Sequence, residues 1–304
     1  MYSLSTCWNS HRHTDGRAML REIRDLGFEY AELSHGIRIS LLPGILEAVD
    51  AKEIKISTVH NFCPLPIGIT QANPNIFKFT STDARERDNA FRYTIKSLET
   101  AARVGAQLVV LHMGDIDMKD YTDKLIELVG AGQKDSPKYA KLCAEVEDKR
   151  EAKKEKYYEL AKEMLRRVAE QAEVRGIKLG MENREALEEI PLDHDFTFFL
   201  REFAGPTVRY WHDTGHAQIK ANLGFIVHAM HLENLAEHLA GLHVHDVQLP
   251  AQDHCPPGSG MIDYVALKPF VKPEHIKVFE MNPGVPAEEV LKGVAHLKSI
   301  WGPE

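Results

Sequence analysis

Cysteine is scarce in this chain, and long apolar runs are absent. The 304 residues include four cysteines, Cys7, Cys63, Cys143 and Cys255, and no two of them form a CxxC pair. This spacing argues against a disulfide framework and against a cysteine-rich zinc site, so we expect reduced thiols. No apolar run reaches the ~18 residues that a membrane span needs, and we expect no membrane partner. The first residues, MYSLSTCWNSHRH, lack the pattern of a signal peptide, which favours a cytoplasmic protein.

Excess positive charge and glycine-rich phosphate loops are also lacking. The formal net charge is −8 and no run of Lys and Arg stands out, so a polyanion such as DNA is disfavoured as a partner. Neither GxGxxG nor GxxxxGK[ST] follows the first expected strand, which weighs against a nucleotide-binding sheet. Hydrophobic residues make up 43% of the chain and charged residues 27%, as in globular proteins.

Short apolar runs alternate with amphipathic stretches along the chain. Because this alternation implies a parallel sheet, and about eight such units fit the roughly 250 residues of a barrel, we predict a closed (β/α)8 (TIM) barrel, α/β in class, as a single domain over residues 1–304. From the periodicity we expect strands at 2–7, 30–33, 55–59, 107–111, 178–181, 208–211, 241–244 and 276–279, and helices at 18–26, 41–49, 84–104, 154–173, 195–203, 223–239 and 288–300.

One segment does not fit the bare repeat. Residues 115–153 follow the fourth expected strand and are rich in Lys, Asp and Glu. We interpret them as a polar helical insertion that is either simply solvated, a lid over the strand ends, or a contact in a homo-oligomer.

Ionisable residues gather where the expected strands end. His60, His112, Glu182, Asp213 and Glu280 each stand at such an end, and so does the HVHD stretch with His243, His245 and Asp246. In a parallel barrel these ends meet on one rim, which carries the active site. Because so many histidines and carboxylates on one rim need a compensating charge, we predict a site for a divalent cation there.

Four stretches, GMENR, WHDTGHA, LHVHDV and VFEMNP, together resemble the xylose isomerase-like TIM barrel superfamily over nearly the whole chain. That superfamily includes sugar isomerases, ketose 3-epimerases, inosose dehydratases and the endonuclease IV family. The resemblance implies one divalent metal held by Glu182, Asp213, His243 and Glu280. His243 is preferred over His245 because the family's ligand lies three residues before an Asp, here Asp246.

The resemblance further implies a metal-dependent isomerase or epimerase acting on a ketose, polyol or sugar phosphate. Glu182 and Glu280 would move a proton at the carbon next to a carbonyl, through an enediolate held by the metal. Three carboxylates and one imidazole suit Mn²⁺ best, with Mg²⁺, Co²⁺ and Zn²⁺ as alternatives. An inosose-type dehydratase would use the same site and stays open.

A second alternative is a zinc phosphodiesterase of the endonuclease IV type, acting on abasic DNA. His60, His112, His216 and His254 match histidine ligands of that family, but Gln252 stands where it has an Asp. We therefore assign these histidines to substrate binding or to a second metal, and we treat nucleic acid as the weaker partner.

Three other residues have open or lesser roles. Arg184 either clamps an anionic group of the substrate or forms a salt bridge with a nearby carboxylate. Glu32 either binds substrate or is a structural carboxylate of the rim. His212, beside Asp213, is expected to point away from the site.

Overall fold

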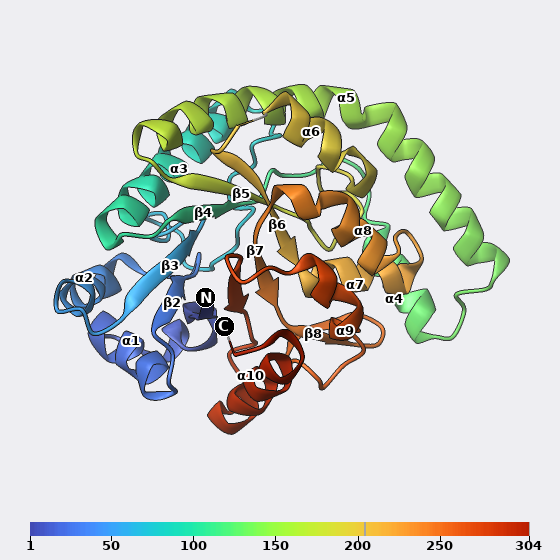
Figure 1. Cartoon of the computed structure of the whole chain (residues 1–304). Coiled ribbons are helices and arrows are strands. Elements are labelled where there is room, and N and C mark those ends of the chain that lie inside the picture. The colour runs from blue at the N-terminus through green and yellow to red at the C-terminus, as the bar shows by residue number, and fades with distance from the viewer. Residues whose placement is uncertain (204, 304) are drawn as a thin grey trace.

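The computed structural model describes residues 1–203 and 205–303 (Figure 1). Its eight parallel strands close into a barrel in the order β1-β10-β7-β6-β5-β4-β3-β2, so the predicted barrel is confirmed. The barrel strands are β1 Tyr2–Ser5, β2 Tyr30–Leu33, β3 Lys55–His60, β4 Leu108–Leu111, β5 Lys178–Glu182, β6 Val208–Asp213, β7 Leu239–Val244 and β10 Ile276–Phe279.

Helices surround the barrel, and α3, α5 and α6 arch over one side of it in Figure 1. Helix α3 has the expected bounds because its ends carry clear signals: the Asp83 side chain accepts a hydrogen bond from the Arg85 N–H, and Gly105 ends the helix at φ 71°. The helices are α1 Gly16–Asp25, α2 Leu42–Asp50, α3 Ala84–Val104, α4 Thr122–Gly130, α5 Pro137–Val174, α6 Phe196–Glu202, α7 Thr214–Leu223, α8 His228–Leu235, α9 Tyr264–Leu267 and α10 Ala287–Trp301. Short 3-10 turns lie at Thr6–Trp8, Ser10–Arg12, Ile39–Leu41, Asp193–Asp195, Ala236–His238 and Lys268–Phe270.

The polar segment 115–153 contains α4 and the first part of α5. The expected helix start at 154 was wrong: α5 begins at Pro137, where the Ser136 side chain accepts a hydrogen bond from the Tyr139 N–H. The sequence shows no amphipathic pattern for the first part of α5, because only three of its side chains are buried: Tyr139, Val146 and Arg150. A role of this segment as a lid or an oligomer contact stays a prediction.

Two elements near the strand ends escaped the sequence reading. Helix α7 follows Asp213 directly and is buried on nearly all sides, so it shows no amphipathic pattern. The expected helix at 223–239 is accordingly shorter, α8 and a 3-10 turn. After β7 the chain makes a small antiparallel hairpin of β8 Asp246–Gln248 and β9 Gln252–Cys255. Both elements carry residues of the rim.

The core has two parts. A small inner cluster inside the barrel contains Trp211, Leu108 and Val278, and a larger one fills the space between the strands and the helices. The indole of Trp211 needs Gly241 beside it, because a Cβ there would come within 2.4 Å of the ring. Trp211 is fully buried and its ring lies 5.1 Å from that of His243, so it forms the floor beneath the rim.

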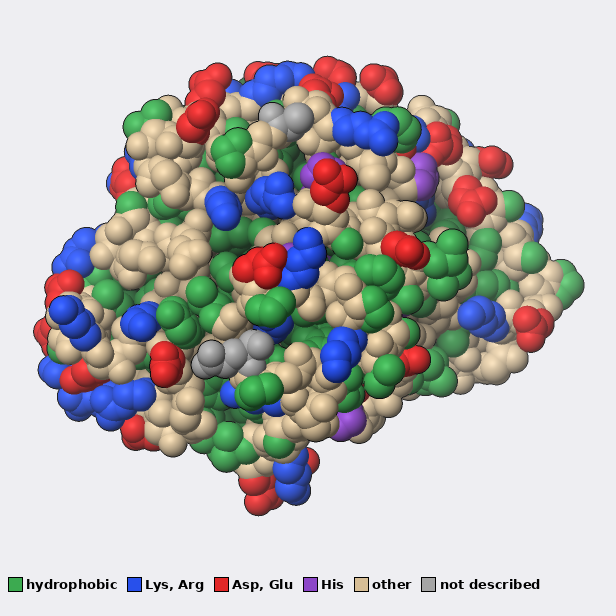
Figure 2. All heavy atoms as spheres, viewed as in Figure 1, with side chains coloured by type: hydrophobic (Ala, Val, Ile, Leu, Met, Phe, Trp, Pro, Cys, Tyr) green, Lys and Arg blue, Asp and Glu red, His purple; other side chains and the backbone are tan. Residues whose placement is uncertain are grey.

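The surface and the chain ends complete the fold. On the face drawn in Figure 2, basic and acidic side chains are interspersed and form no continuous basic patch.

The Tyr2 hydroxyl donates to the carbonyl of Gly302 at 2.8 Å, which holds the two ends of the chain together (Figure 1). Within the described residues, every helix is too short or too polar to cross a bilayer.

Candidate metal centre

Glu182, Asp213, His243 and Glu280 converge at one end of the barrel. They come from the carboxyl ends of β5, β6, β7 and β10, which are neighbours in the sheet order. One ligand atom from each lies within 4.8 Å of the other three, and all four residues are buried. Parallel strands with matched ends therefore bring together residues that are almost 100 positions apart in sequence.

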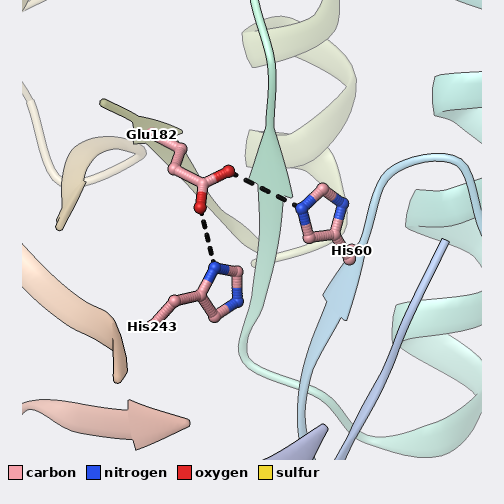
Figure 3. Close-up of side chains that lie close together, drawn as sticks. All are labelled: His60, Glu182 and His243. Atoms are coloured by element: carbon pink, nitrogen blue, oxygen red, sulfur yellow. Dashed lines mark hydrogen bonds and ion pairs between the residues drawn. The ribbon is translucent and has the colours of Figure 1, made fainter. Parts of the chain in front are cut away.

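The imidazole of His243 is the centre of this group. Its Nδ1 lies 2.7 Å from Oε1 of Glu182, 3.2 Å from Oε2 of Glu280 and 3.8 Å from Oδ2 of Asp213. Figure 3 shows the contact with Glu182, whose other oxygen faces His60. One nitrogen facing three carboxylates is the arrangement expected where a cation binds.

Glu32 supports His243 from behind. Its Oε2 lies 3.0 Å from Nε2 of His243 and also accepts the Thr58 hydroxyl at 2.8 Å. A carboxylate on the second nitrogen fixes the ring and leaves Nδ1 free to act as a ligand. Of the two roles left open for Glu32, this geometry favours the structural one.

The donor set fits a divalent cation. Three carboxylates and one imidazole supply ligands that such a cation takes, and Oε2 of Glu182, although 2.7 Å from Nε2 of His112, has no well-aligned hydrogen bond among the described residues. A buried carboxylate oxygen without a well-aligned hydrogen bond is unfavourable unless a bound group completes its contacts.

The two glutamates of the centre have different electrostatic environments. Burial raises the pKa of Glu280 to about 7, with Glu32 and Glu182 adding to the effect and His243 opposing it. Burial also acts to raise the pKa of Glu182, but His243 and His112 outweigh it and hold that pKa well below its ordinary value. A pair of carboxylates separated in this way can divide the acid and base roles between them.

His60 and His112 contact the second carboxylate oxygen of Glu182, and the ring of His60 stacks on that of His243 with centroids 5.6 Å apart. The Nε2 atoms of His60 and His112 are 3.6 Å and 2.7 Å from Oε2 of Glu182, and both nitrogens of His112 lack a well-aligned hydrogen bond in the described chain. The ring of His35 packs at 5.0 Å from that of His60, and its Nδ1 is also buried without such a bond. The sequence reading missed His35, although it follows a strand by two residues.

Arg184 contacts His216 and two glutamates. Its Nε donates to Oε1 of Glu189 at 3.1 Å, its Nη1 lies 3.1 Å from Nδ1 of His216, and Glu182 is 3.6 Å away. The salt bridge expected as one alternative is therefore present, with Glu189 as the partner. Burial and Arg184 lower the pKa of His216 to about 4, although Asp213 opposes them.

His245 and His254 form a separate group beside Asp213. Nε2 of His245 lies 3.0 Å from Asp213, and its Nδ1 accepts the backbone N–H of His254 at 2.8 Å. Gly215 permits this approach, because a Cβ there would lie 2.0 Å from the His245 ring. Gln252 is exposed on β9, so the residue that replaces the expected Asp faces solvent. His245 thus contacts one carboxylate, whereas His243 faces three.

His212 points to the opposite face of β6, as expected. There it belongs to a group that we call the outer histidine network, made of Tyr210, His212, His228 and His231. The Tyr210 hydroxyl also bonds to Oδ1 of Asn183 at 3.1 Å. Asn183, which the sequence reading missed, accepts from the N–H of Asp213 at 2.7 Å and donates to its carbonyl at 3.0 Å. Its amide therefore holds the backbone of a proposed ligand.

The family model of the xylose isomerase-like TIM barrel matches residues 20–300. The chain belongs to this family. The match covers all four strands that carry the residues of this centre. A comparison with curated protein sequences finds no match.

Solved structures share this xylose isomerase-like fold at low sequence identity. A D-tagatose 3-epimerase-like protein has a TM-score of 0.70 at 19% identity, covering 98% of this chain and 96% of that one. A 3-keto-D-glucoside 4-epimerase from E. coli also scores 0.70, at 15% identity over 98% of both chains. A D-psicose 3-epimerase scores 0.67 at 13% identity over 99% of both.

Proposed function

We propose that this chain is a divalent-metal-dependent epimerase or isomerase of small sugars, with ketoses epimerised next to their carbonyl as the leading reaction. The observation that supports it most is Nδ1 of His243 facing Glu182, Asp213 and Glu280 at the mouth of the barrel. The structural neighbours whose names state an activity on tagatose, psicose or a keto-glucoside fit the same chemistry. We propose Mn²⁺ as the resident ion, with Mg²⁺, Co²⁺ or Zn²⁺ as alternatives.

Glu182 and Glu280 are the proposed proton carriers. When bound, the cation would make the carbon next to a sugar's carbonyl more acidic. Its neighbours favour the ionised form of Glu182, which is the proposed acceptor of that proton, whereas burial favours the protonated form of Glu280, the proposed donor. The two come from β5 and β10, with β6 and β7 between them, so they can reach a substrate from two sides. Delivery to the same carbon gives an epimer, and delivery to the adjacent carbon gives an isomer.

The remaining rim residues are proposed to bind the substrate. Nδ1 of His112 is buried without a hydrogen-bond partner among the described residues, and its Nε2 and that of His60 face Glu182, so both rings are suited to sugar hydroxyls at this rim. His216 and His254 line the other side of Asp213. The buried guanidinium of Arg184, 3.6 Å from Glu182, supplies a positive charge where a second cation would be repelled. This supports one ion rather than a zinc cluster.

The test is hydrogen exchange in D₂O. The protein, loaded with Mn²⁺, is incubated with D-tagatose, D-psicose and D-fructose and followed by NMR. We expect deuterium at C3 together with the C3 epimer. Glu182→Gln and Glu280→Gln should each lower the rate roughly 10²- to 10⁴-fold, as loss of an acid or base does. The exposed Glu233→Gln is the matched control.

Other outcomes identify other reactions. Exchange at C1 with formation of an aldose indicates an isomerase, and loss of water from an inosose indicates a dehydratase. Cleavage of abasic DNA without any exchange in sugars would replace this proposal with the phosphodiesterase.

A further inference from the structure

A cavity lies outside the barrel, away from the candidate metal centre. It has a volume of about 450 Å³ and is bounded by α5, by the turn at Asp193–Asp195 and by α8 with the loop before it. Its size is within the range of small-molecule sites. None of the rim residues lines it, so the proposed sugar chemistry does not account for it.

Arg150 of α5 lines this cavity and is an unusual residue. Its side chain is only 5% exposed, and its Nε is buried without a hydrogen-bond partner among residues 1–203 and 205–303. No ion pair of Arg150 occurs in that described part of the chain either. A guanidinium stays charged at every physiological pH, and a buried charge without a partner is strongly unfavourable. We therefore expect an anion to bind beside this guanidinium.

The acidic residues near Arg150 do not supply that anion. Asp193 pairs with Lys220, and Glu151 pairs with Lys154 at 2.8 Å. Glu147 lies one turn before Arg150 on α5 and is exposed. These carboxylates line the cavity, and Arg150 helps to lower the pKa of Asp193, but none of the three forms an ion pair with Arg150 in the described chain.

Part of the wall formed by α8 and the loop before it is apolar, although His231 and Asn234 of α8 also line the cavity. The apolar part contains Phe225, Ile226, Val227 and Met230, and the last two are 61% and 58% exposed. Two large apolar side chains exposed beside a buried cation fit a ligand that has one charged end and one hydrocarbon end.

We propose that this cavity binds a small organic monocarboxylate, with the carboxylate on Arg150 and the hydrocarbon body against Val227 and Met230. Arginine and carboxylate match as a planar, bidentate pair. A phosphate dianion fits less well, because Glu147, Glu151 and Asp193 line the same cavity and would repel the second charge. The proposal does not depend on the activity of the metal centre.

Calorimetric titration of the full chain tests the site. The probes are acetate, butyrate, hexanoate, neutral hexanamide and inorganic phosphate. We expect affinity to rise from acetate to hexanoate and hexanamide not to bind. Arg150→Met should weaken hexanoate binding roughly tenfold or more, as loss of a charge-assisted pair does. Lys149→Gln, one residue away and exposed, removes the same charge and should leave binding unchanged.

Two further variants guard against trivial results. Met230→Glu alters an exposed position, so the fold is not at risk, and it should weaken hexanoate by like-charge repulsion. Asp213→Asn should leave hexanoate binding intact, which separates this site from the metal centre. Absence of hexanoate binding, equal binding by Arg150→Met, or tighter binding of phosphate than of hexanoate would each overturn the assignment.

Discussion

Strand β6 carries histidine-rich groups on both of its faces, and the two differ in their partners. On the inner face, Asp213 joins His243, Glu182 and Glu280 at the rim. On the outer face, Tyr210 and His212 join His228 and His231 in the outer histidine network. Side chains alternate along a strand, so Asp213 and His212 are adjacent in sequence yet belong to different sites.

The two groups show that carboxylates, rather than histidines, mark the candidate metal centre. In the outer network the imidazoles hydrogen-bond to neutral groups: the Tyr210 hydroxyl, another imidazole, and Oε1 of Gln218 at 3.0 Å from Nδ1 of His228. The carboxylate of Asp193 also lies near the network, 3.9 Å from Nε2 of His231. Burial lowers the pKa of His228 to about 3 and, despite Asp193, that of His231 to about 4, so both rings are neutral at pH 7. At the rim, His243 faces carboxylates on both nitrogens, and its pKa is raised well above its ordinary value even though burial opposes this.

The largest expected effect is a loss of metal affinity when a residue of the inner group is changed. Asp213→Asn removes the charge of one proposed ligand, and we expect metal affinity to fall by more than the roughly 10- to 100-fold typical of a supporting residue. Asn also caps helices well, so α7 should survive the change. Metal content by mass spectrometry after dialysis measures this. His228→Gln, on the outer face, should keep its metal. Equal loss of metal in both variants would contradict the view that the inner group alone binds the ion.

A smaller effect is expected at the residue behind His243. Glu32→Gln keeps an acceptor for Nε2 but removes the charge, so Nδ1 becomes a weaker ligand. We expect Mn²⁺ affinity to drop roughly tenfold, towards the lower end of the effects of such supporting carboxylates. A fluorescent competitor titration gives the affinity, with exposed Glu29→Gln as the control. Wild-type affinity in Glu32→Gln would mean that Glu32 does not support the centre.

The smallest effect concerns the outer network and acid. His228 and His231 have folded pKa values of about 3 and about 4, below the ordinary 6.5. As pH falls below 6.5 the unfolded chain takes up these protons first, so this stability is present above pH 6.5 and is lost down to about pH 4 for His231 and about pH 3 for His228. Each histidine can contribute roughly 1.4 kcal/mol per pH unit in that window. Urea unfolding at several pH values gives the free energy of unfolding. This free energy should fall less steeply with decreasing pH in His228→Gln than in wild type or in exposed His11→Gln. Parallel curves would indicate that His228 is not neutral in the fold.

Several features of this protein could be predicted from its sequence because they are local. The alternation of apolar runs and amphipathic stretches indicated the barrel, and Asp83 and Gly105 marked the ends of α3. Strand-end positions predicted that Glu182, Asp213, His243 and Glu280 meet, since parallel strands end on one rim. The assignment of these residues as ligands stays a prediction.

Other features depended on contacts between distant segments. Helix α7 was hidden because burial on all sides removes the amphipathic pattern, and the start of α5 was hidden because it packs through only three side chains. The sequence alone determined which residues stand at the mouth of the barrel. Only the tertiary structure decided that Nδ1 of His243 faces three carboxylates whereas His245 contacts one, and that Glu189 pairs with Arg184. It also decided that Nε of Arg150 is buried without a hydrogen-bond partner among the described residues. The physical reason is that spacing along a strand fixes the direction of a side chain, whereas its neighbours are fixed by the register and packing of other elements.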